Sequence, residues 1–384
     1  MRSLPRTLPA VVTAALPMAV AAEPRFELAP SLSLAQGWDD NLFLSPDRPV
    51  ADAVTRLSPG LRAGLRSPRL DASLSYSQEG EFFAEQSALG TAAARRAAEA
   101  ALRYSGGRGL LLEAVQSYTA TLSPGELVLP TGLDFGRRPA TQLTSRESLS
   151  VLLGPRTRGT VRYEFVRDTI EGGVAGRTHT ADLTLERTRS ERTRVGLGYT
   201  LRRFGSAGAW TTSHVLLAQW SHSLGPRTGI RLAAGPRVTA GRGEPELEGE
   251  LSVQRRFRRG DVTAAYGRTQ ARILGQPGVG STESATVTLA GEVFRDLRIA
   301  VSPGLFRNHL PPADLTVRRL ATDVTWSIGR SVSILGSYVL AATRGAVSGD
   351  VLHEVFSIRF SFASPPRPPV PARAPGEDPA GARP

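Results

Sequence analysis

Apolar and polar residues alternate with a period of two along most of the chain. In 161–165, Val, Tyr and Phe alternate with Arg and Glu, and the same pattern recurs at 183–186, 195–202 and 298–305. A strand with one apolar and one charged face fits a sheet that separates lipid from water. The runs extend for about eleven to fourteen residues, which is near the length of a tilted strand that crosses a bilayer. Strands of soluble sandwiches are usually shorter.

The breaks between these runs fall into two alternating classes. The short turns lie at 67–69, 106–108, 154–156, 190–192, 225–227, 259–261, 295–296 and 329–330. The other breaks, several of them longer, lie near 39–50, 84–92, 123–141, 170–177, 205–210, 241–245, 275–281, 308–313 and 343–350. Outer-membrane barrels alternate short periplasmic turns with longer external loops. The sequence therefore predicts a transmembrane antiparallel up-and-down β-barrel.

Eight turns and nine loops join eighteen strands, within a predicted range of sixteen to eighteen. An even number places both termini in the periplasm of a Gram-negative envelope. The segment 91–104 is rich in Ala, Arg and Glu, a composition that also suits a helix, although it keeps the period of two. One texture runs through the chain, so we expect a single barrel over 23–362 rather than several soluble domains.

The two ends of the chain differ from this texture. Arg2 and Arg6 precede an apolar stretch from Leu8 to Val20, and small residues follow. This is typical of a secretory signal peptide, predicted over 1–22. The segment 363–384 is rich in Pro and Ala and cannot form a core, so we expect a disordered periplasmic tail.

Composition narrows the function classes. Cysteine is absent, which excludes disulfides and thiolate chemistry. All 47 basic residues are Arg, and the net charge is +12. The arginines are dispersed, with no basic block interleaved with aromatic residues, so we expect no nucleic-acid partner.

The last predicted strand carries a row of apolar residues on one face, namely Phe356, Ile358, Phe360 and Phe362. A final strand that ends in aromatic residues is the signal that the barrel-assembly machinery reads. We therefore expect this machinery and outer-membrane lipid as partners.

A motif marks the first loop. The stretch Gly37-Trp38-Asp39-Asp40-Asn41-Leu42-Phe43 precedes an Asp-led strand, 52–61, that ends in Ser-Pro-Gly-Leu. Over about 28–78 the chain resembles a family of outer-membrane β-barrels associated with exopolysaccharide-export and PEP-CTERM gene clusters. The resemblance implies export of a polysaccharide together with periplasmic export proteins.

The triplet Asp39-Asp40-Asn41 also has a local interpretation. Asp and Asn hydrogen-bond their own backbone and form turns at strand ends. Oxygen ligands of this kind could begin a calcium loop, but the remaining ligands and their spacing are missing. We therefore favour a turn and expect no metal and no cofactor.

If the apolar phase faces lipid, the opposite phase lines the lumen. Arginines prevail on that phase and could favour anions, including an anionic polymer. Acidic residues on the same phase could instead pair with them and stiffen the wall. The predicted pore-lining arginines are Arg56, Arg62, Arg103, Arg146, Arg162, Arg194, Arg202, Arg231, Arg237, Arg256 and Arg298.

The loop at 123–141 is the longest, and its segment 127–130 is more apolar than an exposed loop requires. We predict that this loop folds into the barrel as a plug. Barrels of 16–18 strands are wide enough for an aqueous channel, so such a plug could gate or narrow it.

The histidines give no catalytic pattern. None of His179, His214, His222, His309 and His353 lies in a metalloprotease motif, and the sequence has no Gly-x-Ser-x-Gly elbow. We interpret all five as surface residues and expect no enzyme. The sequence thus favours a conduit that exports an anionic exopolysaccharide or capsule polymer. Two alternatives stay open, a general or small-solute porin and a structural or adhesive barrel with a filled lumen.

Overall fold

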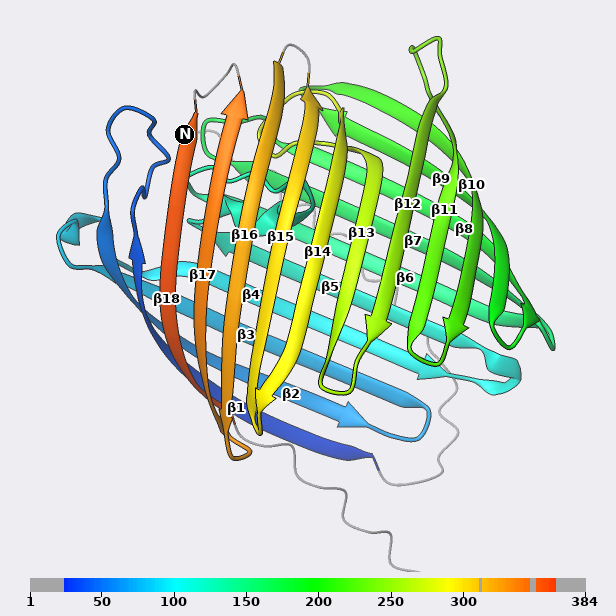
Figure 1. Cartoon of the computed structure of the whole chain (residues 1–384), viewed down its shortest axis with the longest axis horizontal. Coiled ribbons are helices and arrows are strands. Elements are labelled where there is room, and N and C mark those ends of the chain that lie inside the picture. Colours follow the sequence, from blue (N-terminus) through cyan, green and yellow to red (C-terminus); the bar gives the residue numbers. More distant parts are fainter. Residues whose placement is uncertain (1–23, 311–312, 346–349, 364–384) are drawn as a thin grey trace, which may run out of the picture.

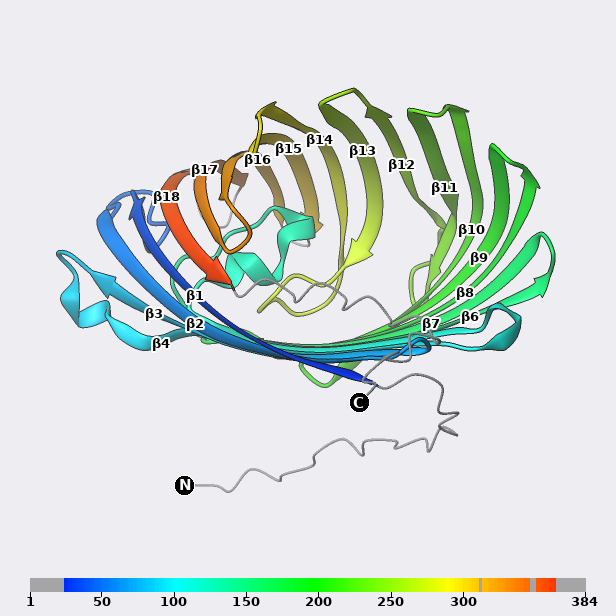
Figure 2. The same ribbon diagram turned by 90° about the horizontal axis from the view of Figure 1, so that it is seen from below.

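The computed structural model describes residues 24–310, 313–345 and 350–363. These residues form a closed barrel of 18 antiparallel strands (Figures 1 and 2). The predicted signal peptide and the tail beyond Ala363 lie outside the described residues. The predicted fold class and the number of strands are confirmed.

The strands are long and the remaining elements are short. The strands are β1 (Arg25–Asp39), β2 (Asp52–Arg66), β3 (Leu70–Phe83), β4 (Thr91–Ser105), β5 (Leu111–Thr121), β6 (Ala140–Gly154), β7 (Thr157–Ile170), β8 (Gly176–Ser190), β9 (Thr193–Ser206), β10 (Ala209–Gly225), β11 (Thr228–Thr239), β12 (Glu246–Arg256), β13 (Gly260–Ala271), β14 (Gly280–Phe294), β15 (Leu297–Leu310), β16 (Ala313–Ile328), β17 (Val332–Gly345) and β18 (Val351–Ala363). The 3-10 turns are η1 (Ser87–Leu89), η2 (Gly107–Gly109), η3 (Pro124–Leu127) and η4 (Leu129–Thr131). Among the described residues, no helix is both long enough and apolar enough to span a bilayer.

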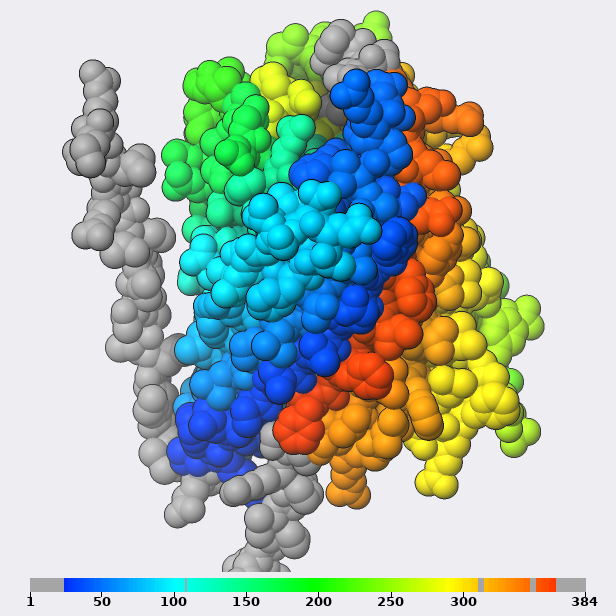
Figure 3. Space-filling view, turned by 90° about the vertical axis from the view of Figure 1, so that its left-hand side faces the viewer, coloured from blue at the N-terminus to red at the C-terminus, as the bar shows by residue number. Residues whose placement is uncertain are grey.

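Each strand pairs with its neighbours in the sequence, and β1 pairs with both β2 and β18. Trp38 of β1 lies opposite Phe356 of β18, and Figure 3 shows the blue first strands beside the orange last strand. This closure removes the free edges that an open sheet would expose.

The breaks between strands match those predicted from the sequence. All eight short turns fall at one end of the barrel, and the nine other connections fall at the opposite end. The strands contain 11 to 17 residues, as the length of the alternating runs indicates. The segment 91–104, whose composition also suits a helix, is strand β4 because its alternation lets it pair with β3 and β5.

The two faces of the wall differ in chemistry. Leu183 and Leu185 of β8 are exposed on one face. Asp182, on the other face of β8, accepts a hydrogen bond from the Thr200 hydroxyl of β9, with 2.5 Å between the oxygens. A continuous apolar outer face is stable against lipid tails rather than water. The wall therefore has the two-faced pattern of a membrane barrel.

Packed apolar side chains lie inside the lumen, near the end that carries the long loops. One cluster contains Leu133, Ile273, Phe306 and Val317. Leu133 and Ile273 belong to loops, whereas Phe306 and Val317 belong to β15 and β16. Loops therefore fold into the barrel and are held there by burial of apolar area.

Candidate functional site: the lumen and its inward loops

The orientation of the arginines follows from contacts between strands that are not neighbours. Arg202 of β9 lies 2.6 Å from Glu248 of β12, and Arg237 of β11 contacts the same carboxylate at 3.1 Å. Two strands separate β9 from β12, so Arg202 and Glu248 must both point inward. Residues alternate between the two faces along a strand, and paired residues on neighbouring strands share a face. By this rule, the pairing between the strands places all eleven predicted arginines on the lumenal face.

Seven of the eleven arginines have acidic partners within 4 Å. They are Arg56, Arg103, Arg146, Arg194, Arg202, Arg237 and Arg298. Most of these partners lie on adjacent strands, as a ladder that stiffens the wall requires. Two contacts are exceptions: Arg202 and Glu248 are separated by two strands, and Arg298 of β15 and Asp261 of β13 by one.

The other four arginines are Arg62, Arg162, Arg231 and Arg256. All four are exposed to the lumen, and none has an acidic partner within 4 Å in the described part of the chain. They lie in the half of the barrel nearer the short turns. This half of the lumen therefore presents these four unpaired positive charges to an incoming solute, beside the lumenal acids Glu99, Glu292 and Asp323, which have no basic partner within 4 Å among the described residues.

The β5–β6 loop, residues 122–139, lies inside the barrel, as predicted for a plug (Figure 2). On one side its Glu126 binds Arg95 of β4 at 2.7 Å. Its Arg137 binds Glu81 of β3, which is only 3% exposed. The Arg137–Glu81 pair is largely buried, so removing either partner would leave an uncompensated charge, whereas the Arg95–Glu126 pair is about a third exposed.

The same loop reaches the opposite wall. Asn308 of β15 donates to the carbonyl of Thr131 at 3.0 Å, and both residues are buried. Leu133 packs against Phe306 and Val317. The loop thus crosses the lumen from β3 and β4 to β15 and β16, and its position is fixed on both sides.

A second loop, the β13–β14 connection at 272–279, also folds inward and was not predicted from the sequence. Its Arg272 binds Asp168 of β7, and its Gly275 pairs with Val174 of the β7–β8 loop. Its Leu274 packs with Val128 of the first inward loop. The sequence signal is weak, since the connection carries Ile273, Leu274 and Val279 as its apolar residues besides glycine and proline.

Between the first inward loop and the wall of β1–β3 and β16–β18 lies a polar cavity of about 270 Å³. Its charged lining consists of Arg56, Arg137, Arg319 and His353 together with the carboxylates of Asp39, Glu81, Glu126 and Asp134. Positive and negative groups therefore balance in this narrowed part of the lumen.

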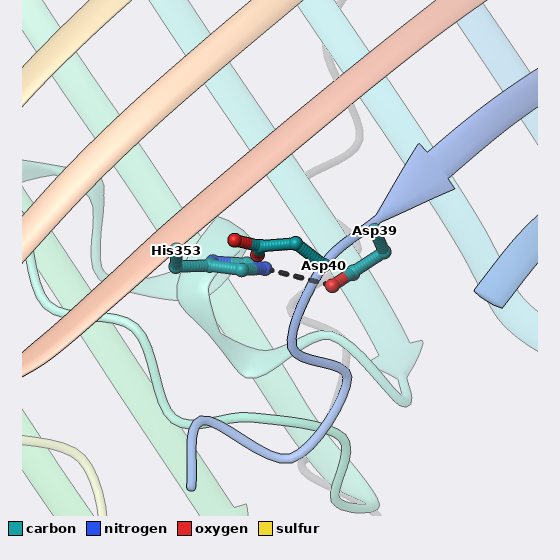
Figure 4. Close-up of side chains that lie close together, drawn as sticks. All are labelled: Asp39, Asp40 and His353. Atoms are coloured by element: carbon teal, nitrogen blue, oxygen red, sulfur yellow. Dashed lines mark hydrogen bonds and ion pairs between the residues drawn. The ribbon is translucent and has the colours of Figure 1, made fainter. Parts of the chain in front are cut away.

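His353 of β18 joins the wall to the loop, and Figure 4 shows it beside the end of β1. Its Nε2 lies 3.0 Å from Asp39 Oδ1, and its Nδ1 lies 3.2 Å from Asp134 Oδ2 of the loop. Burial tends to raise the pKa of Asp134, but the hydrogen bond and charge of His353, with the Phe135 N–H and Arg319, hold that pKa below its usual 3.8. The interpretation of His353 as a surface residue is wrong, because it is 9% exposed and bonded on both nitrogens.

Asp39, Asp40 and His353 also hold three ligand atoms within 4.8 Å of one another, a spacing that could hold a metal ion. The bonding already present uses these atoms otherwise. Asp39 Oδ1 accepts the N–H of Asn41 at 3.0 Å, and Asp40 Oδ1 accepts the N–H of Glu354 at 2.8 Å. A metal bound between Asp39 and His353 would have to break the hydrogen bond between them, so the geometry favours an ion-pair hub.

The motif at the first loop forms the predicted turn. Asn41 Oδ1 accepts the N–H of Ser45 at 2.9 Å, and its Nδ2 donates to the Ser45 carbonyl. Trp38 points outward on the phase of the exposed residues of β1. The following Asp52 is fully buried and accepts the N–H groups of Ala84, Glu85 and Gln86, which fastens the β3–β4 loop.

The remaining predicted residues lie on the outer face. Phe356, Ile358, Phe360 and Phe362 are exposed on the outward phase of β18, between β17 and β1. His214 and His222 also point outward, where His222 stacks on Trp220. His179 lies on the outer face near the loop end, in contact with Trp210.

Together, the closed meander, the apolar outer wall and the lumen narrowed by inward loops define an outer-membrane-type β-barrel. Its wall resembles that of the Pseudomonas aeruginosa channel OccK2 (OpdF), at 13% identity and a TM-score of 0.50, over 88% of this chain and 97% of that chain. OpdQ from the same organism aligns at 9% identity and a TM-score of 0.49, over 88% and 98% of the two chains. The P. aeruginosa siderophore receptor PirA aligns at 9% identity and a TM-score of 0.43, over 89% and 81%. Neither a protein-family model nor a curated protein matches the sequence.

Proposed function

We propose that this chain is a porin-like channel of the Gram-negative outer membrane that passes small anionic solutes. The proposal depends chiefly on one observation, the four water-exposed lumenal arginines without acidic partners, Arg62, Arg162, Arg231 and Arg256. Rings of unpaired arginine favour anions in a pore. The cavity beside the inward loop carries both arginines and carboxylates, so the proposed preference depends on the short-turn half of the lumen.

The long-loop end faces outward and the short-turn end faces the periplasm in this proposal, as in outer-membrane barrels generally. The described chain enters β1 and leaves β18 at the short-turn end, so both termini would be periplasmic. Solutes would then meet the inward loops first and the unpaired arginines afterwards. The row Phe356, Ile358, Phe360 and Phe362 would serve the barrel-assembly machinery.

Small solutes fit this lumen better than the polymer expected from the sequence. Two loops cross it and are fixed at both sides by buried groups, including Asn308, Arg137 and Arg272. A polysaccharide strand would need an open path along the whole axis. The exopolysaccharide conduit therefore becomes the second candidate, supported by the resemblance over about 28–78 and requiring release of the β5–β6 loop. Periplasmic export proteins and an anionic polysaccharide would be its partners.

The test is the reversal potential of the refolded protein in a planar bilayer under a chloride-salt gradient. It compares the native chain with a variant in which residues 125–136 are replaced by a short Gly-Ser linker. We expect anion-selective current in both proteins and a larger conductance in the variant. Silence in both would overturn the channel and favour an anchoring barrel with a filled lumen. Permeation by long uronate oligomers in the native chain would favour the polymer conduit.

A further inference from the structure

Three arginines on the outer face gather at the long-loop end of β7, β8 and β9. Arg167 of β7 lies opposite Arg177 of β8, and Arg203 of β9 lies opposite His179 of β8. All three side chains are exposed. Their strand phase is that of Val161 and Leu183, so they belong to the wall that faces lipid, in positions where an apolar residue is expected.

Among the described residues, none of these three arginines has an acidic partner within 4 Å, and none of them donates a side-chain hydrogen bond. Arg203 lies 4.4 Å above the Trp210 ring, a cation–π contact that leaves its N–H groups free. Elsewhere on the outer wall an arginine is neutralised, since Arg268 lies 3.6 Å from Glu283. The three-arginine cluster is therefore an uncompensated positive patch.

A layer of aromatic rings lies directly on the membrane side of this patch. The hydroxyl of Tyr163 lies 2.8 Å from His179 Nδ1, and the His179 ring lies 4.9 Å from Phe165 and 5.9 Å from Trp210 between centroids. Such rings mark the interface between acyl chains and headgroups in membrane barrels. Along β7, the outward residues run Tyr163, Phe165 and Arg167 towards the loop. The arginines thus lie at the depth of the headgroups.

Two arginines of the patch line a surface hollow of about 400 Å³, and the third, Arg203, lies on the Trp210 ring that lines it. Its lining includes Arg167, Arg177, Gly205, Ser206 and Trp210. Glycine at 205 lets the Trp210 ring lie against the backbone, because a Cβ there would meet the ring at 2.8 Å. The guanidinium groups offer forked donors that match the oxygens of a phosphate.

We propose that this hollow binds the phosphorylated headgroup of an outer-leaflet lipid. The acyl chains would run down the apolar phase of β7 and β8, over Val161 and Leu183, with the aromatic layer at their upper ends. The proposal rests on the orientation proposed above, with the long loops outside, but not on conduction. Soluble phosphate shares the headgroup chemistry without the acyl chains, so the two sources can be separated.

The test uses native mass spectrometry of the refolded barrel in detergent. The probes are bisphosphorylated lipid A, the same lipid after removal of its phosphates, and inorganic phosphate. The variant is Arg167→Gln, Arg177→Gln and Arg203→Gln combined. The matched control removes three exposed arginines towards the opposite end, Arg187→Gln, Arg189→Gln and Arg255→Gln. Barrel formation is checked for both by the heat-dependent gel shift.

We expect the native chain to prefer the phosphorylated lipid, and the three-arginine variant to bind it at least about tenfold more weakly. The control variant should keep the native affinity, and millimolar phosphate should displace little lipid. Equal binding of both lipids, an equal loss in the control variant, or full displacement by inorganic phosphate would each overturn the proposal. Because the readout is lipid binding, a barrel that conducts nothing could still support it.

Discussion

Asp134 of the inward β5–β6 loop and His353 of β18 lie 3.2 Å apart, between Oδ2 and Nδ1, and so join the loop to the barrel wall. His353 is bonded through its other nitrogen to Asp39 of β1. One imidazole therefore holds the loop against the seam where the first and last strands meet.

Acidification should loosen this link. The pKa of Asp134 is lowered in the folded chain, so its contribution to stability is fully present above its usual 3.8 and is lost as the pH falls through the lowered value. We expect single-channel conductance to be steady from pH 8 to about pH 5 and to rise once the pH falls below 3.8, the usual pKa of Asp134. Asp134→Asn should remove most of that acid-dependent step. An unchanged step in Asp134→Asn would assign it to another group.

Glu248 should be a strong determinant of stability. It is 3% exposed and accepts bonds from Arg202 and Arg237, of which Arg237 is 1% exposed. Removing one partner of a buried ion network leaves uncompensated charge, so Glu248→Gln should destabilise the barrel by about 3 kcal/mol. Urea-induced unfolding in liposomes measures this. The control is Glu250→Gln, an exposed acid two residues further along the same inward face, which should change stability little.

Gly132 should be required for the position of the inward loop. Its φ is +68°, and a Cβ there would clash with the ring of Phe306. Gly132→Ala should therefore displace the loop and raise conductance. Gly172→Ala is the matched control, because Gly172 has a φ of +72° and open space around its Cβ position. Equal conductance changes in the two variants would attribute the effect to backbone strain alone.

The unpaired lumenal arginines should set ion preference. Replacing Arg62, Arg162, Arg231 and Arg256 together by Gln should move the reversal potential towards that of a non-selective pore. The control replaces four lumenal arginines that have acidic partners, Arg103, Arg146, Arg194 and Arg298. Their acidic partners Glu113, Glu164, Glu186 and Asp261 are replaced by the matching amides in the same variant, so the net charge of the lumen does not change. The reversal potential of this control should stay near the native value, and an equal shift in both variants would contradict the electrostatic account.

The barrel could be read from the sequence because its signals are local. Alternation fixes which face a residue occupies, and turn residues fix where a strand ends, so β1–β18 and the lumenal arginines followed without tertiary information. The inward position of the β5–β6 loop was predictable because Leu127 and its neighbours are too apolar for an exposed loop.

Other features depend on contacts between distant parts of the chain. His353 gave no local sign of its bonds to Asp39 and Asp134, because all three residues lie on different segments. The β13–β14 loop has only three apolar residues besides glycine and proline, Ile273, Leu274 and Val279, too few to indicate burial. The outward patch of Arg167, Arg177 and Arg203 did carry a signal, since each breaks the apolar phase of its strand near the loop end. That signal was hidden by the abundance of arginine.

The β5–β6 loop belongs to the first half of the sequence. It is held in place by Asn308, Val317 and His353, which belong to the last quarter of the sequence. During biogenesis these partners arrive after the loop itself. The loop can therefore settle only once the C-terminal strands have inserted, and until then the lumen stays open. A protease should therefore cut the β5–β6 loop in a partly assembled barrel and leave it intact in a fully assembled one.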